Sequence, residues 1–442
     1  MRNSQARWRR LCIGVALTGT LSVPAFAGAA YGTVATGPFG PPGTAATASP
    51  ESPTSTAPPP SPSGDEFAQL SPAVDAQLDD AIRQVMQEAN VPGVMVAVSA
   101  PGKGQYLRSF GVADKATGQQ MSPNLYMRIG SETKTFTVTA MLELVDQGKL
   151  GLDDPIGKYV SGVPNGDRIT LRELAGMRSG LFNYSADPDF DKAFISNPDH
   201  PFTPQELLDY SFKHPVNFQP NAQFEYSNTN LILLGLVVEK VGGMPLQDFI
   251  AKNVTRPVGL RHTIFPTDAA FPDPHAHGYT NQTPTGQIED STDWNPSWGW
   301  AAGAMISDLQ DMRTWAKVVA TGTLLTADTQ AQRLKTGPSG IPGTGYGLGI
   351  FNVQGWIGHN GSLPGYESLT IYLPEHQATL VVLLNTDVLH DGVEPSTLFG
   401  QAITQIVSPQ HVFNLPTSTE PHASASASTS ASSSTSASSP GS

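Results

Sequence analysis

A serine and a lysine three residues apart, Ser131 and Lys134, are the first residues in this sequence whose spacing suggests chemistry. They lie in the stretch RIGSETKTFT, where a strongly apolar segment begins. On a helix this spacing is about one turn, so the two side chains would share a face. A buried ammonium loses its proton more readily than an exposed one, and the amine that results can take the proton of a neighbouring hydroxyl. The pair therefore indicates a serine nucleophile with a lysine base.

The Ser-x-x-Lys spacing has little weight alone, because a chain of this composition should contain about one match by chance. A serine that opens a helix is also most often an N-cap, which is the alternative interpretation of Ser131. An N-cap does not require a lysine one turn inside an apolar helix. Lys134 is therefore the more informative residue of the pair.

A serine nucleophile with a lysine base needs a second proton carrier for the leaving group, and FEYSNTN supplies Tyr226 together with Asn228. These residues come directly before an apolar helical segment. Tyr279 and Asn281 have the same spacing but lie in a polar stretch that no helix follows, so Tyr226 is preferred. The alternative for Tyr226 is a half-buried tyrosine with a hydrogen-bonded hydroxyl.

A strand should line the cleft, and three short segments that end in glycine are candidates: 335–337, 359–361 and 390–392. The first ends a helical segment, where glycine is expected as a C-cap, and the third lies in the loop before the last helix. Only His359-Asn360-Gly361 follows a strand signal, and its flanking glycines allow close approach of a ligand to the backbone.

Taken in order, these elements resemble the penicillin-recognising serine hydrolases. The resemblance covers about residues 70–408 and is greatest to the branch with class C β-lactamases, Streptomyces-type D-alanyl-D-alanine carboxypeptidases, related esterases and D-amino-acid peptidases. It rests on RIGSETKTFT, ITLRELAGMRSGL, FEYSNTNLILLGLVVEKVGG, AAGAMISDLQDM, GYGLGIF and IGHNGSLPGY.

The resemblance implies a role for each candidate residue. Ser131 would be acylated, Lys134 would be its general base, and Tyr226 would carry protons to the leaving group. The backbone N–H groups of Ser131 and Ser362 would form the oxyanion hole. The resemblance also implies substrate-binding residues, namely Asn228, His359, Asn360 and Gly361. It implies two-step hydrolysis through an acyl-enzyme, with no metal and no cofactor.

Two departures from the family pattern bear on the substrate. β-Lactamases usually have Lys-Thr-Gly where this chain has His359-Asn360-Gly361. In addition, no lysine or arginine occurs from residue 336 to the end, so a substrate carboxylate would need a cation such as Lys335. The sequence favours a D-alanyl-D-alanine carboxypeptidase-like peptidase acting on cell-wall peptides. An esterase or β-lactamase with the same machinery, and an inactive wall-binding module, stay open as alternatives.

The elements that must position these residues follow from periodicity. Helices are expected over 71–89, from Ser131 to about Gly148, over 301–322 and over 395–407; strands are expected over 91–100, 105–114, 345–353, 355–361, 366–373 and 378–386. Between about 150 and 300, short helical signals alternate with long loops. The fold class is therefore α/β: an antiparallel sheet flanked by helices, completed by both ends of the chain, with a mostly helical insertion.

The two ends of the chain have a different composition. Residues 1–27 have four arginines, an apolar run and a small-x-small site, which predicts a signal peptide and a secreted or cell-envelope protein with no stable membrane insertion after cleavage. Residues 28–66 and 416–442 predict disordered Pro/Ser/Thr-rich and Ser/Ala/Thr-rich segments, leaving a hydrolase domain over 67–415.

Composition limits the partners. The single cysteine, Cys12, lies in the signal, which excludes thiol catalysis and a disulfide framework in the mature chain. A net charge of −13 and the lack of a basic cluster argue against nucleic acid as a partner. The expected partner is a small peptide, ester or β-lactam substrate, and the sequence does not indicate an oligomeric state. Asp273, His275 and His277 could face a metal, but solvated histidines are the expected reading of this Pro-flanked loop.

Overall fold

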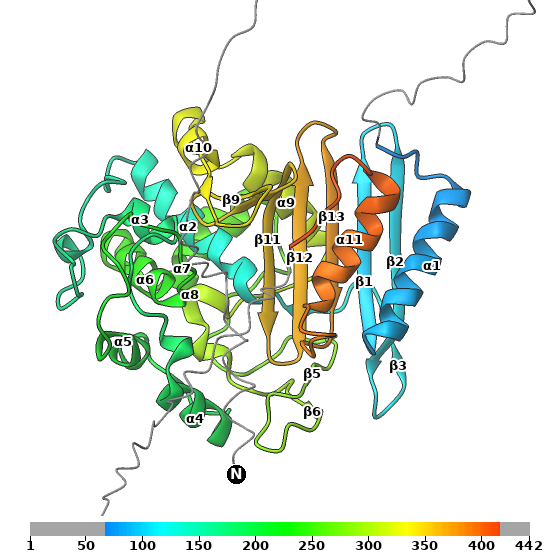
Figure 1. Cartoon of the computed structure of the whole chain (residues 1–442), viewed down its shortest axis with the longest axis horizontal. Helices are drawn as coiled ribbons and strands as arrows, with labels where there is room; N and C mark the ends of the chain where they lie inside the picture. Colours follow the sequence, from blue (N-terminus) through cyan, green and yellow to red (C-terminus); the bar gives the residue numbers. More distant parts are fainter. Residues whose placement is uncertain (1–66, 416–442) are drawn as a thin grey trace, which may run out of the picture.

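A computed structural model describes residues 67–415, and the predicted signal and the two predicted disordered segments lie outside the described residues. Its centre is a nine-stranded antiparallel sheet in the order β3-β2-β1-β13-β12-β11-β10-β9-β8 (Figure 1). The strands are β1 Gly93–Ala100, β2 Gly104–Asp114, β3 Gln119–Gln120, β8 Gly337–Pro338, β9 Thr344–Tyr346, β10 Phe351–Val353, β11 Trp356–Leu363, β12 Tyr366–Leu373 and β13 Ala378–Leu384.

Both ends of the chain build the middle of this sheet, as the sequence predicts. β1 pairs with β13, with Val94 opposite Leu384 and Ser99 opposite Thr379. β12 and β13 are buried along their whole length because helices cover both of their faces. The α/β fold class with an antiparallel sheet is confirmed.

Helices lie on both faces of the sheet. α1 (Pro72–Glu88) and α11 (Pro395–Val407) pack side by side on one face, and α9 (Leu309–Thr321) packs on the other (Figure 1). α1 begins at the predicted Ser71, whose hydroxyl accepts from the Val74 N–H. α2 (Thr133–Asp146) begins beside β11 and runs into the helical part of the molecule.

The helical part contains the predicted insertion. It holds α3 Leu171–Ala175, α4 Pro188–Ser196, α5 Pro204–Phe212, α6 Asn228–Gly242, α7 Leu246–Ile250 and α8 Trp300–Gly303, and α10 (Ala327–Leu334) follows α9. Two small two-stranded sheets were not predicted: β4 (Met127–Arg128) with β7 (Ile306–Ser307), and β5 (Tyr279–Thr280) with β6 (Glu289–Asp290). α6 is apolar nearly all round because α2, α3, α5, α7 and α8 all pack against it.

Two predicted elements are divided in the structure. The helix expected over 301–322 is instead α8, a short strand and α9, because the Asp308 side chain accepts from the Asp311 N–H and starts a new helix. The strand expected over 345–353 is β9 and β10, separated by a turn in which Gly349 has φ +66°.

Among residues 67–415, no single helix has the length and apolar character needed to cross a membrane. One bent pair, Asn228–Gly242 with Leu246–Val258 at 74°, meets the criterion by length and composition only.

Candidate active site

Ser131 lies in a tight 3₁₀ turn, Gly130–Glu132, between β4 and α2. Its hydroxyl does not cap α2, since the N-cap position is Glu132 and no side chain caps this end. Instead Ser131 Oγ lies 2.9 Å from Lys134 Nζ. The N-cap interpretation of Ser131 is therefore wrong, and the spacing between serine and lysine serves a direct contact.

Lys134 is completely buried at the start of α2. Its ammonium also donates to the carbonyl of Ala302 at 2.7 Å, and it lies 4.9 Å from the centre of the Tyr226 ring. The Ala302 carbonyl is available because α8 stops at Gly303 instead of continuing as a helix. The end of α8 thus holds Lys134 Nζ towards Ser131 Oγ.

The break after α8 is itself held by α2. Thr137 Oγ1 donates to the Ala301 carbonyl at 2.7 Å, and the Met305 N–H donates to Thr133 Oγ1 at 3.0 Å. Thr133, Lys134 and Thr137 thus fix both sides of the break from a single helix. Any movement of this segment would move the partner of the lysine.

Tyr226 is half-buried just before α6, and its ring is near Lys134 and 6.3 Å from the His359 ring, centre to centre. The loop before α4 supports it: the Glu225 N–H donates to the Met177 carbonyl, and the Ser227 N–H lies 3.5 Å from Met177 Sδ. Met177 has φ +59°, a left-handed conformation that turns the backbone back towards residues 225–227. The structure therefore brings Ser131, Lys134, Tyr226 and His359 together.

The turn that carries the predicted nucleophile Ser131, Gly130–Glu132 (the nucleophile turn), packs against β11. A Cβ on Gly130 would lie 2.6 Å from the Ser362 nitrogen, and one on Gly361 would lie 2.0 Å from the Ile129 carbonyl oxygen. Ser368 Oγ of β12 donates to the same Ile129 carbonyl at 2.9 Å. Both glycines are required here because a side chain on either would separate the turn from the strand.

This contact places Ser131 beside an open strand edge. β10 pairs with β11 only up to Gly358, and the strand pairings of the described residues leave 359–363 without a partner on that side. The Ser362 nitrogen lies here, close to Gly130 and so to the nucleophile turn. Its N–H and that of Ser131 are the predicted oxyanion-hole donors, and their placement is consistent with that role.

His359 is buried and neutral. Its Nδ1 is 2.5 Å from the Asn360 carbonyl, which can only accept, so Nδ1 carries the proton and Nε2 accepts from the Tyr346 hydroxyl at 3.0 Å. Burial, reinforced by the charge of Lys134, lowers the pKa of His359 to about 3. Burial also raises the pKa of Tyr346, which keeps it a donor. His359 therefore brings no positive charge to the surroundings of Lys134 and Tyr226.

Two predicted substrate-binding residues have side chains that are otherwise engaged. Asn360 Nδ2 donates to Glu394 Oε2 at 2.7 Å on the α11 side of the sheet, because alternate residues of a strand point to opposite faces. Asn228 Nδ2 donates to Ser185 Oγ at 3.0 Å. A substrate contact of Asn228 stays a prediction, and Asn360 can contribute there only through its backbone.

A further acid lies behind the nucleophile. Glu132 is completely buried, and the hydroxyls of Ser368 and Thr370 face its carboxyl. Burial raises the pKa of Glu132 to about 8. Sequence reasoning did not single out Glu132, although an acid inside an apolar helix start is a visible signal.

Lys335, the cation that the sequence suggested for a substrate carboxylate, is exposed at the end of α10. Arg178 is half-buried in the loop that supports Tyr226, and its Nη2 donates to the Pro338 carbonyl of β8 at 2.9 Å. Arg333 is buried and bonded to Thr139 Oγ1 and the Thr135 carbonyl. Of these three cations, Arg178 is the one that lies on the loop supporting Tyr226.

This arrangement defines a class of protein. A buried lysine contacts a serine at the open edge of an antiparallel sheet, and a helical subdomain carries the accompanying tyrosine. The profile of the Beta-lactamase family matches residues 78–399, and the chain belongs to this family of serine hydrolases.

Solved structures and sequence relatives similar to this chain include amide hydrolases. A D-stereospecific amidohydrolase from Streptomyces sp. has a TM-score of 0.68 and 29% identity, over 75% of this chain and 98% of that one. The D-amino acid amidase from Ochrobactrum anthropi SV3, solved with D-phenylalanine, has a TM-score of 0.64 and 28% identity, over 74% and 99%. Protein flp of Staphylococcus aureus (strain MW2) is 25% identical over 70% of this chain, and the match spans only 62% of that relative's length.

Proposed function

We propose that the chain hydrolyses amide bonds of D-amino-acid substrates through an acyl-enzyme on Ser131. The observation that carries the proposal is the 2.9 Å contact between Lys134 Nζ and Ser131 Oγ at the open edge of β11. The Lys134 ammonium must first lose its proton, which burial favours; the neutral amine then takes the proton of Ser131 as Oγ attacks the substrate carbonyl carbon. The oxyanion then accepts from the N–H groups of Ser131 and Ser362.

The second half of the reaction returns the enzyme to its starting state. The C–N bond breaks as the leaving nitrogen takes a proton from Tyr226, and Tyr226 recovers a proton from protonated Lys134. Water then attacks the acyl ester and loses a proton to the neutral Lys134 amine. The ester bond to Ser131 Oγ breaks as Oγ takes that proton back, which releases an acid and free serine. General acid–base catalysis of this kind typically contributes 10²–10⁴-fold.

An amide or ester is preferred to a free carboxylate because of the charges at the site. His359 is neutral and has both ring nitrogens engaged, so the predicted third element supplies no cation. The likeness to a D-stereospecific amidohydrolase and to a D-amino acid amidase, whose chains this one covers almost completely, supports the same choice.

D-Alanyl-D-alanine carboxypeptidase activity, the expectation from the sequence, is the second candidate. Arg178 favours it. This half-buried residue belongs to the loop that supports Tyr226, and its guanidinium lies against the Gly337 backbone of β8. A guanidinium is well suited to hold a carboxylate. In this case Arg178→Gln would abolish turnover of the dipeptide.

The test compares D-phenylalanine amide, L-phenylalanine amide and D-alanyl-D-alanine with the wild type and with Ser131→Ala. We expect the D-amide to be hydrolysed fastest and the variant to be at least 10³-fold slower. Faster release of D-alanine from the dipeptide would favour the carboxypeptidase. Equal turnover by wild type and Ser131→Ala on every substrate would refute the mechanism.

A fluorescent penicillin provides a second measure of the same serine. A label that persists on the wild type and is absent from Ser131→Ala would show slow deacylation, whereas rapid turnover would favour a β-lactamase. p-Nitrophenyl esters test the esterase alternative. An inactive wall-binding module is disfavoured because Ser131, Lys134 and Tyr226 are held together.

We also propose that the protein is exported and acts in the cell envelope. The support is the basic and apolar pattern of residues 1–27. Fractionation of cells that produce the full chain, followed by N-terminal sequencing of the mature protein, tests this. A protein found only in the cytoplasm with Met1 retained would contradict it.

A further inference from the structure

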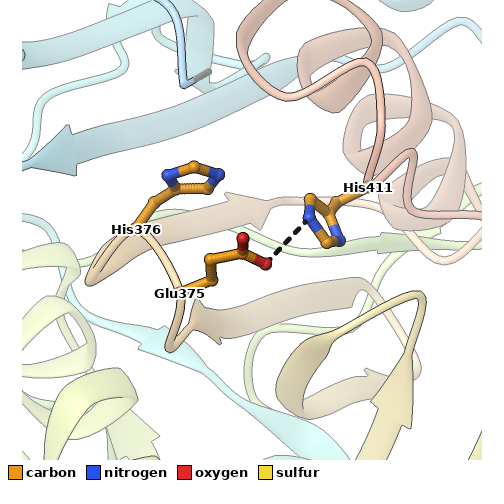
Figure 2. A group of neighbouring side chains, drawn as sticks. All are labelled: Glu375, His376 and His411. Carbon is orange, nitrogen blue, oxygen red and sulfur yellow. Dashed lines mark ion pairs between the residues drawn. The ribbon is translucent and has the colours of Figure 1, made fainter. Parts of the chain in front are cut away.

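Two histidines and a glutamate gather at one end of the sheet, away from the nucleophile. Glu375 and His376 lie in the turn between β12 and β13, and His411 lies in the segment after α11 (Figure 2). One ligand atom of each lies within 4.8 Å of the others. The sequence did not suggest this group, because His411 is distant from the other two along the chain.

The orientation of each ring is suited to a ligand. His411 Nδ1 is 2.8 Å from the Gln354 carbonyl, which can only accept, so Nδ1 carries a proton. The other ring nitrogen, Nε2, faces Glu375. His411 Nε2 lies 3.4 Å from Glu375 Oε2. His376 Nε2 is a buried atom with no hydrogen-bond partner among the described residues. A buried polar atom of this kind is costly unless something binds it.

One of the three distances between ligand atoms matches a tetrahedral ion, and the other two are at most 4.8 Å. Zinc bonds to histidine nitrogen and carboxylate oxygen are about 2.0–2.1 Å, so neighbouring ligand atoms of a tetrahedron are roughly 3.3–3.4 Å apart. The distance between Glu375 Oε2 and His411 Nε2 has this value. Two histidines and a glutamate, with water as a fourth ligand, form a zinc-binding set.

We propose that Glu375, His376 and His411 bind a Zn²⁺ ion that fastens the end of the domain to the β12–β13 turn. The surroundings fit this structural role. The His411 carbonyl accepts from Trp356 Nε1 at 2.7 Å, and the Phe67 ring lies 5.9 Å from that of His376. The ion would thus join the last part of the described chain to the β12–β13 turn, beside Phe67.

A simple ion pair between Glu375 and a protonated His411 is the alternative. It explains the 3.4 Å contact but gives His376 no role and leaves its Nε2 without a partner. The two interpretations differ in what His376→Gln does. Zinc binding needs His376, and the ion pair does not.

A second group of possible ligands is less suitable. His262, Asp308 and Asp311 also lie close together. Asp308 caps α9 and pairs with His262, while Asp311 Oδ2 accepts from the His262 N–H and from Thr263 Oγ1. These groups satisfy one another without an ion, so His262 serves as a control.

The experiment is a Zn²⁺ titration of the full chain, without a polyhistidine tag, followed by calorimetry and by the thermal unfolding midpoint. The wild type should bind one Zn²⁺ per chain and unfold at a higher temperature with it. His376→Gln and His411→Gln should each weaken binding at least tenfold and lose the thermal shift. His277→Gln, half-buried and paired with Asp290, and His262→Gln should behave as wild type.

If His411→Gln does not fold, Glu375→Gln replaces it, since that side chain is 57% exposed. Binding that survives in His376→Gln would overturn the three-ligand site and leave the ion pair. Wild-type binding weaker than about 100 μM, or equal weakening in the control variants, would also overturn it.

Discussion

Lys134 is the residue on which the proposed chemistry depends, because its ammonium reaches Ser131 Oγ and the Ala302 carbonyl from one buried position. Lys134→Ala should lower the rate of acylation by a fluorescent penicillin or a p-nitrophenyl ester by about 10²–10⁴-fold. The Ala302 carbonyl loses a donor, which costs about 1–3 kcal/mol of unfolding free energy but leaves the fold intact. Lys335→Ala, which removes an exposed lysine, is the control and should be acylated at the normal rate. A normal rate in Lys134→Ala would exclude Lys134 as the base.

His359 should not titrate in the working range of the enzyme. Its pKa is lowered to about 3, so it stays neutral between about pH 5 and 8. His359→Gln should change only the level of kcat/KM, and both pH profiles should have the same shape. A limb near pH 6.5 that is present in the wild type and missing from the variant would contradict the neutral assignment.

Glu132 predicts a pH dependence of stability. Its pKa is about 8 in the fold, while the unfolded chain ionises near the ordinary 4.5. The unfolded state therefore binds fewer protons between these values, so stability is present in full below about pH 4.5 and falls as pH rises towards 8. One pKa unit corresponds to about 1.4 kcal/mol, which makes the loss on the order of a few kcal/mol.

Glu132→Gln, which cannot ionise, should remove this part of the slope in urea unfolding measured from pH 5 to 8. The exposed Glu88→Gln should keep the wild-type slope. An unchanged slope in Glu132→Gln would mean that the buried carboxyl does not hold its proton.

At the scale of elements, the contact between the Gly130 turn and β11 is the most sensitive feature. A Cβ on Gly361 would meet the Ile129 carbonyl oxygen at 2.0 Å, so Gly361→Ala must push the strand from the turn. We expect activity to fall at least 10²-fold, because a displacement of about 1 Å can cost this much. Overpacking should also cost about 1–3 kcal/mol. Hydrolysis and urea unfolding measure the two effects.

Gly303→Ala is the matched control for this substitution. Gly303 is also buried beside the nucleophile turn, but the nearest atom to its Cβ would be 3.9 Å away, an ordinary contact. It should retain activity within a few fold. Equal losses in the two variants would show that β11 does not set the position of Ser131.

How far sequence predicts each element depends on where its boundary signals lie. α11 was predicted with its observed bounds because Pro395 opens it and one face of it is apolar. Residues 301–322 were predicted as one helix, since the apolar pattern outweighed the Asp308 cap. β9 and β10 were predicted as one strand. Glycines at 345, 347 and 349 alternate along this segment, so no single glycine marks where the first strand ends and the turn begins.

The same holds for the site. Ser131, Lys134 and Tyr226 could be found because each belongs to a local motif. The Ala302 carbonyl and Tyr346 could not, since a backbone oxygen has no sequence signal and both contacts join distant segments. Strand alternation does predict that the Asn360 side chain points to the face of the sheet opposite that of His359, so its engagement away from the site could have been expected.

At the scale of the whole molecule, the two ends of the described chain both pack against the domain at α11. The Ala68 N–H donates to the Val407 carbonyl at 2.8 Å, and Phe413 is completely buried against α11. Phe413→Ala should lower the unfolding free energy by about 3–5 kcal/mol in urea, because it leaves a cavity. Ile288→Ala, at a side chain that is 54% exposed, should change it by less than about 0.5 kcal/mol. A neutral Phe413→Ala would show that the chain end is dispensable.

The pairing of β1 with β13 has a consequence for how the protein is made. These strands come from opposite ends of the chain, and Val94 meets Leu384 only after almost the entire domain has left the ribosome. Pairings between such distant residues form slowly, because a long loop must close first. β11 (Trp356–Leu363), which lies beside the Ser131 turn, is itself made only shortly before β13. On the proposed mechanism a half-synthesised chain therefore cannot acylate, and activity appears only once the last strands have been made.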